Sequence, residues 1–89
     1  MAKKVKIGNK NLTIGSQVLS SKSVTGHAWQ PDNEWVLGKV AIGTRGQISN
    51  IASEREGGKN WKYFTVFFPD SGLYFEVSEW MADQFFTTI

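Results

Sequence analysis

The side chains that could serve acid–base chemistry in this chain are concentrated between residues 20 and 37. His27 is the single histidine, and the carboxylates of Asp32 and Glu34 follow it in the same stretch. An imidazole with carboxylates nearby is a minimal set for general acid–base catalysis, so these three residues define a hydrolase hypothesis. No spacing among them fixes a geometry, and the serines of residues 20–23 have a lysine beside them instead of an activating base. The sequence therefore predicts that the protein is not an enzyme and has no catalytic residues.

The sequence also contains no pattern typical of a metal site or of a cofactor-binding loop. The chain contains no cysteine, and its one histidine supplies too few ligands for a metal site. Residues Gly43-Thr44-Arg45-Gly46 include two glycines, but the Lys-Ser/Thr ending of a phosphate-binding loop is missing and a strand is expected to follow instead of a helix. We therefore expect no metal and no cofactor.

Aromatic residues interleaved with cations are the remaining chemistry of the chain. The set comprises Trp29, Trp35, Trp61, Tyr63 and Tyr74 with Lys39, Arg45, Lys59 and Lys62. Surfaces of this kind stack bases, hold peptides or cage methylated ammonium groups. Trp29 and Trp35 stand out because they fall in a stretch without a regular period, whereas most other rings are expected to fill the core. The residues predicted to bind a partner are Trp29, Trp35, His27, Asp32, Glu34 and Arg45.

The charge of the chain favours a protein partner over nucleic acid. The formal net charge is only +2, far from the basic excess of a protein that neutralises many phosphates. Asp32 and Glu34 also lie between the two tryptophans, where they would repel phosphates. The alternative is RNA or DNA binding, because the first ten residues hold four of the ten cations. The residues of that alternative are Lys3, Lys4, Lys6, Lys10 and Arg45.

Alternating apolar and polar residues predict an all-β chain. Residues 1–14 are expected to form an N-terminal hairpin or arm, and residues 15–89 a barrel. The first barrel strand is expected at Gln17-Val18-Leu19, before a long irregular loop from Ser20 to Leu37. A second strand follows over residues 47–52, where the odd spacing of Ile48 and Ile51 indicates a β-bulge.

The strongest strand pattern runs from Trp61 to Phe68 and ends at the turn residues Pro69-Asp70-Ser71-Gly72. Residues 53–60 before it are expected to be a mobile polar turn, and residues 73–77 are expected to pair with it. Ser78 is expected to cap a single helical turn over residues 79–82, before a last strand at residues 85–88 closes against the first. The expected core is Val18, Ile48, Phe64, Val66, Phe68, Phe75 and Val77.

Three short segments carry a resemblance to a known fold: Ile14–Leu19, Gly43–Ile48 and Phe64–Phe68. Their order resembles the SH3-like barrels of the KOW and Tudor type, and the small barrel subunits that dock electron carriers on cyanobacterial photosynthetic complexes. The resemblance implies an all-β, SH3-like antiparallel barrel of five or six strands, with one short helical turn near the C-terminus. In such barrels a long first loop folds back over the barrel mouth, where its aromatic residues can line a ligand groove.

The function that we expect is that of a non-enzymatic binding module with a protein partner. KOW-type barrels contact RNA or ribosome-associated partners, whereas the photosynthetic subunits dock proteins, so the resemblance implies both ligand classes. A compact barrel without cysteine also suits an accessory subunit or a phage-encoded inhibitor of a host enzyme. The 89 residues make one domain, 1–89, because two cores would each be too small. No apolar run approaches the roughly 20 residues that cross a bilayer, and the absence of cysteine favours the cytoplasm.

Overall fold

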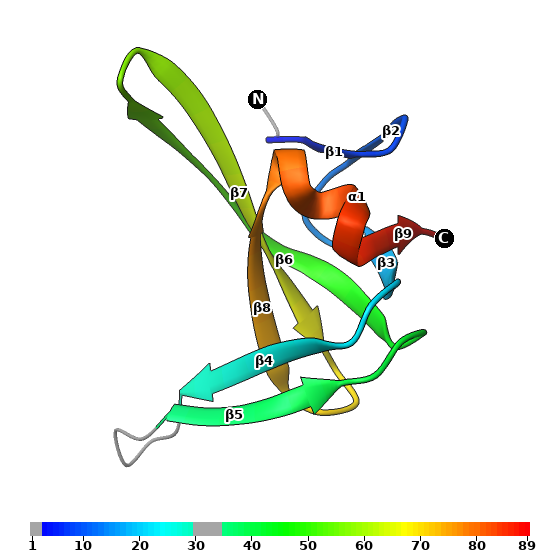
Figure 1. Ribbon diagram of the computed structural model, residues 1–89. Coiled ribbons are helices and arrows are strands. Elements are labelled where there is room, and N and C mark those ends of the chain that lie inside the picture. Colours follow the sequence, from blue (N-terminus) through cyan, green and yellow to red (C-terminus); the bar gives the residue numbers. More distant parts are fainter. Residues whose placement is uncertain (1–2, 30–34) are drawn as a thin grey trace.

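The computed structural model describes residues 3–29 and 35–89, with Trp29 and Glu56 described by their backbone alone. Seven antiparallel strands form one curled sheet, in the order β5-β4-β8-β7-β6-β3-β9, and two more form a separate hairpin (Figure 1). The strands are β1 (Val5–Ile7), β2 (Lys10–Leu12), β3 (Gln17–Ser20), β4 (Val24–Trp29), β5 (Trp35–Val40), β6 (Arg45–Glu56), β7 (Lys59–Phe68), β8 (Leu73–Ser78) and β9 (Phe86–Thr88). A 3-10 helix η1 (Glu79–Met81) and a short helix α1 (Ala82–Phe85) precede β9.

The expectation of a mostly β, antiparallel chain with one short helical segment near the C-terminus is confirmed. The number of strands differs, because nine strands lie in the described part of the chain instead of five or six. Two hairpins account for the difference. The β1–β2 hairpin lies at the N-terminus where a hairpin is expected, whereas the β4–β5 hairpin replaces most of the loop expected from Ser20 to Leu37.

Small residues explain why the β4–β5 hairpin has no visible strand period. Gly26 and Gly38 face each other in its register, and both lie on Leu73 of β8. A Cβ atom on Gly26 would lie 2.9 Å from Leu73 Cβ, and one on Gly38 would lie 2.9 Å from Leu73 Cδ1. The inward positions therefore hold glycine where a strand pattern normally shows a large apolar residue. These close contacts hold the hairpin against the sheet.

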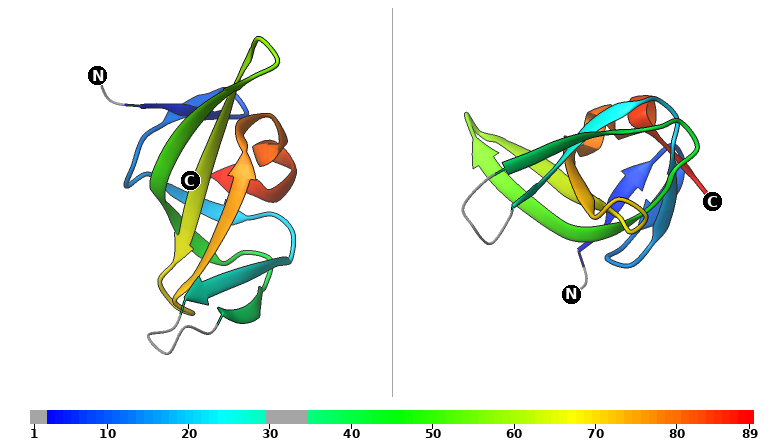
Figure 2. Two further views of the ribbon diagram at one scale, coloured as in Figure 1. Left: turned by 90° about the vertical axis from the view of Figure 1, so that its left-hand side faces the viewer. Right: turned by 90° about the horizontal axis from the view of Figure 1, so that it is seen from below.

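The core occupies the inner face of the curled sheet, against which α1 and the N-terminal hairpin pack (Figure 2). Six of the seven expected core residues are buried: Val18, Ile48, Phe64, Val66, Phe68 and Val77. Phe75 is only half-buried, and its ring lies 5.5 Å from that of Phe85 and 5.9 Å from that of Phe86. Val5, Ile7 and Leu12 of the N-terminal hairpin belong to the same core, so this hairpin is docked on the curled sheet.

The β6–β7 pair contains one confirmed expectation and one correction. The register shifts between Ile48 and Asn50, so both Ile48 and Ile51 are buried, as the predicted bulge requires. The mobile turn expected over residues 53–60 is wrong, because the ladder continues to Glu56 and Lys59. Gly57 and Gly58 make the connection, with φ angles of 59° and 78° that suit a two-residue hairpin turn. The residues are polar because the tip of this ribbon projects into solvent (Figure 2).

The C-terminal segment follows the expected order. Ser78 precedes η1 at the N-cap position, but its side chain makes no capping hydrogen bond. β9 pairs with β3, so the last strand does close against the first. Within the described residues, no helix has the length and apolar character needed to span a membrane.

Candidate binding surface

The outer face of the sheet, which points away from the buried core, carries a row of large, mostly aromatic side chains across four strands. Leu37 of β5 pairs with His27 of β4, His27 pairs with Tyr74 of β8, and Tyr74 pairs with Phe67 of β7. Side chains on one strand alternate between faces, and Val24, Val40, Leu73 and Phe68 supply the buried positions of the same strands. The row therefore lies on one continuous surface.

Ring contacts hold this row together. The rings of His27 and Trp35 meet edge to face with centroids 5.1 Å apart, and those of Phe67 and Tyr74 lie 4.8 Å apart. Trp35 is 60 % exposed, Leu37 70 % and Tyr74 39 %, while His27 and Phe67 are half-buried. We name these five residues the hairpin patch. The exposed side chains pack on their half-buried neighbours, and this arrangement is typical of a preformed contact surface.

The structure brings together some of the residues predicted to bind a partner. His27 and Trp35 are in contact, and the backbone of Trp29 pairs with that of Trp35 at the same end of the hairpin. Asp32 and Glu34 lie outside the described residues. Arg45 is exposed at the start of β6, and β8 and β7 lie between that strand and β4. Arg45 therefore lies on a strand that does not neighbour the strands of Trp29 and Trp35 in the sheet.

The lysines of the nucleic-acid alternative lie on the N-terminal hairpin. Lys3, Lys4, Lys6 and Lys10 are all exposed. Hydrogen bonds fix the hairpin beside β7 and η1: the Lys6 N–H donates to Glu79 Oε2 at 2.8 Å, and Lys62 Nζ donates to the carbonyl of Lys4 at 2.9 Å. These lysines therefore belong to a hairpin that is fixed to the rest of the protein, instead of to a loose arm. Arg45, the fifth residue of the nucleic-acid alternative, lies on β6.

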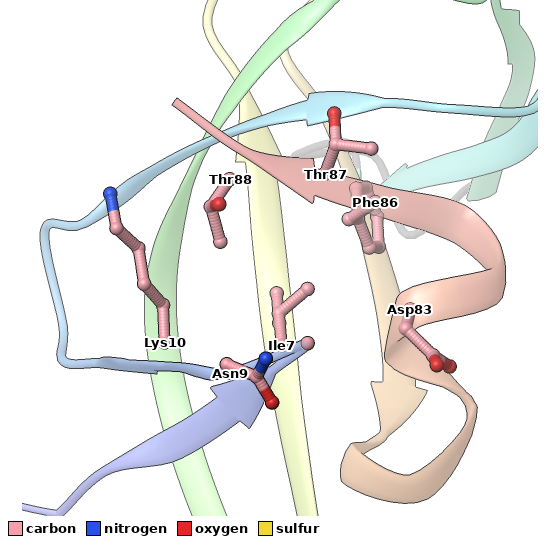
Figure 3. A pocket seen from close by; sticks show the side chains of 8 residues that line it. Ile7, Asn9, Lys10, Asp83, Phe86, Thr87 and Thr88 are labelled. Carbon is pink, nitrogen blue, oxygen red and sulfur yellow. The ribbon is translucent and has the colours of Figure 1, made fainter.

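Surface hollows lie beside this hairpin and beside the beginning of β7. The first has a volume of about 370 Å³ between the N-terminal hairpin and β9. Figure 3 shows Lys10 and Asp83 on opposite sides of this hollow, with Ile7 and Thr88 between them. The second, of about 520 Å³, is lined by Gly57, Lys59, Trp61, Tyr63, Ser78 and Trp80. The third, of about 230 Å³, is lined by Lys6, Gly8, Glu79, Trp80 and Asp83.

The second hollow is a functional candidate that sequence reasoning did not assign. Lys59, Trp61 and Tyr63 alternate along β7 and so share its outer face. Tyr63 pairs with Ser78, and this pairing brings Trp80 of η1 next to the two β7 rings. The alternation of Trp61 and Tyr63 is visible in the sequence, but the position of Trp80 depends on the register of β7 with β8.

The described residues contain no metal-binding cluster, because no group of three or more His, Asp or Glu side chains among them is close enough to hold a metal ion. Of the three residues of the hydrolase hypothesis, Asp32 and Glu34 lie outside the described ranges.

Comparison with known proteins returns no relative. No protein-family model matches the chain, and no curated protein and no solved structure gives a significant match.

Proposed function

We propose that this protein is a non-enzymatic binding module that docks a protein partner through the hairpin patch. The observation that carries the proposal is the exposure of Trp35 and Leu37 on a hairpin that glycine contacts hold against the sheet. A few large side chains of this kind supply most of the binding energy of a protein interface. Because the underlying hairpin is already ordered against Leu73, little conformational entropy is lost when a partner binds.

The charge around the patch supports a protein ligand. None of the five patch residues is a lysine, arginine, aspartate or glutamate, and Lys39 and Glu76 flank them with opposite signs. Asp32 and Glu34 also fall between the two tryptophans in the sequence. A polyanion gains nothing from such a surface, whereas an apolar protein surface is complementary to it.

The strand order supports the finer assignment of an SH3-like barrel, which we propose for residues 15–89. β3, β6, β7, β8 and β9 are five strands in the neighbour order β8-β7-β6-β3-β9, with the helical turn just before the last strand. The β4–β5 hairpin then takes the place of the long first loop. A cytoplasmic accessory subunit and a phage-encoded inhibitor are the two settings that we propose for such a module.

The test is capture of a partner from a lysate, with and without nuclease, followed by calorimetry with the purified partner. We expect capture to survive nuclease treatment, and Leu37→Ala and Trp35→Ala each to weaken binding about thirtyfold, as residues that dominate an interface do. Ile42→Ala is the matched control, because Ile42 is also 70 % exposed but lies in the turn between β5 and β6. Loss of the partner on nuclease treatment, with unchanged binding by both variants, would contradict the proposal.

A further inference from the structure

Hollows beside the beginning of β7, at the other end of that strand from Phe67 of the hairpin patch, follow one another along the protein surface through shared lining residues. The second and third hollows share Trp80, and the third shares Gly8 and Asp83 with the hollow of Figure 3. The path therefore runs from Tyr63 on β7, past Trp80 on η1, to Lys10 on β2. We name it the Trp80 groove. We propose that the Trp80 groove binds a single-stranded nucleic acid, with bases stacked on its aromatic rings and phosphates beside its lysines.

The aromatic rings provide the stacking surface. Trp80 is 64 % exposed, and the half-buried Trp61 and Tyr63 lie in the same hollow. Because Trp61 and Tyr63 are alternate residues of one strand, their side chains are about 7 Å apart along it. Rings presented in this way can receive successive unpaired bases, and such stacking tolerates any base because every base has a flat face.

Lysines in the groove can contact the phosphates of a polyanion. Lys59, Lys6 and Lys10 each line a different one of the three hollows. The second hollow has Lys59 and no Asp or Glu among its lining residues, whereas Glu79 and Asp83 lie beside the lysines of the other two hollows. Glu79 Oε2 accepts the backbone N–H of Lys6 at 2.8 Å. The second hollow, with three rings and a lysine, is therefore the part of the groove that best suits a base and its phosphate.

A single strand fits the site better than a duplex because its bases are free to stack on the aromatic rings. The bases of a duplex are stacked on one another, so the rings of Trp61, Tyr63 and Trp80 have no base face to contact. A duplex would meet only the lysines, and its binding would depend on charge alone. The comparison of single and double strands therefore separates stacking from electrostatic attraction.

The experiment is fluorescence anisotropy with a labelled ten-residue oligothymidylate and with a duplex of the same length. We expect the single strand to bind more tightly than the duplex, with a slope of log K against log salt of about −2 for three lysine contacts. Trp80→Ala is expected to weaken single-strand binding about tenfold at an unchanged salt slope, and Trp80→Phe to recover most of the affinity. Trp80 is largely exposed, so both variants should keep the melting temperature of the parent protein.

Two matched variants complete the test. Lys59→Ala should make the salt slope shallower by about 0.7, whereas Lys39→Ala on β5 should leave it unchanged. Trp35→Ala, the same substitution at the other end of the molecule, should not change oligonucleotide binding. The proposal is overturned if the parent protein does not bind the single strand at low salt, if the duplex binds equally well, or if Trp80→Ala has no effect. None of these outcomes bears on the hairpin patch, which has its own test with its own partner.

Discussion

The hairpin patch and the Trp80 groove draw on the two ends of the same strand. Phe67, near the end of β7, belongs to the patch, and Trp61 and Tyr63, near its beginning, line the groove. Both regions present aromatic rings on the outer face, but the patch contains no lysine, arginine, aspartate or glutamate, whereas Lys59 lies among the rings of the groove. The rings alone therefore do not determine the ligand. Under our two proposals, the charged residues near each end direct one region to a protein and the other to a polyanion.

The largest expected effect removes the support that both regions share. Phe64 is 1 % exposed at the centre of β7, and Phe64→Ala should cost about 3–5 kcal/mol of unfolding free energy. Chemical denaturation measures this loss. Phe67→Ala is the matched control, since the same strand carries Phe67 half-buried on the opposite face. If Phe67→Ala costs as much as Phe64→Ala, the assignment of inner and outer faces is wrong.

A smaller effect should break the patch and spare the groove. An alanine Cβ at position 26 would lie 2.9 Å from Leu73 Cβ and 3.2 Å from the Tyr74 carbonyl oxygen, neither of which can move easily. Gly26→Ala should therefore cost about 1–3 kcal/mol in thermal or chemical unfolding and weaken partner binding.

Gly38→Ala is the matched comparison for that substitution. Its added Cβ would meet only the end of the Leu73 side chain, at 2.9 Å from Cδ1, and this methyl group can rotate away. We expect Gly38→Ala to cost less than Gly26→Ala. The opposite order would show that the packing of β4 on β8 does not hold the hairpin.

Salt should separate the two regions without any mutation. Raising sodium chloride from about 50 to about 200 mM should weaken oligothymidylate binding at the Trp80 groove about fifteenfold, as expected for three phosphate contacts. Partner binding at the hairpin patch should change less than about twofold, because the patch itself contains no lysine, arginine, aspartate or glutamate. Equal salt responses at both regions would show that charge does not distinguish them.

The smallest expected effect concerns Ser78, which lies between the two β7 rings and η1. Its side chain makes no capping hydrogen bond, so Ser78→Ala should change the unfolding free energy by less than about 0.5 kcal/mol, below the usual cost of losing a cap. Thermal unfolding of the two proteins gives the comparison. A loss of about 1 kcal/mol or more would restore the capping role that the sequence suggests.

Local patterns were sufficient for the parts of the fold that depend on large alternating residues. The alternation of Phe64, Val66 and Phe68 predicts both the strand β7 and its inner face. The spacing of Ile48 and Ile51 predicts the bulge in β6. The β4–β5 hairpin was not predictable in the same way, because Gly26, Ala28 and Gly38 occupy its inward positions. Small residues are selected there by the close approach of Leu73, which is a contact between distant parts of the chain.

The candidate site was predictable to a similar extent. The tryptophans and histidine near residue 30 stand out because they are large residues in a segment without a period, and His27 and Trp35 do make contact. The Trp80 groove was missed because it forms only when β8 places η1 beside β7. The N-terminal lysines are visible in the sequence, but the position of Lys6 beside Trp80 follows from the hydrogen bond between the Lys6 N–H and Glu79 Oε2.

The position of β5 at the end of the strand order has a consequence for how the protein behaves at high concentration. Among the described strands, β5 has β4 on one side and no strand on the other, so part of its backbone donors and acceptors face outward. Trp35, Val36 and Leu37 in this strand are exposed and apolar, and Lys39 is its only charged residue. Soluble proteins commonly protect such an edge from aggregation with several charges or a proline. A partner seated on the hairpin would cover this edge, so its binding would also protect the protein from aggregation through β5.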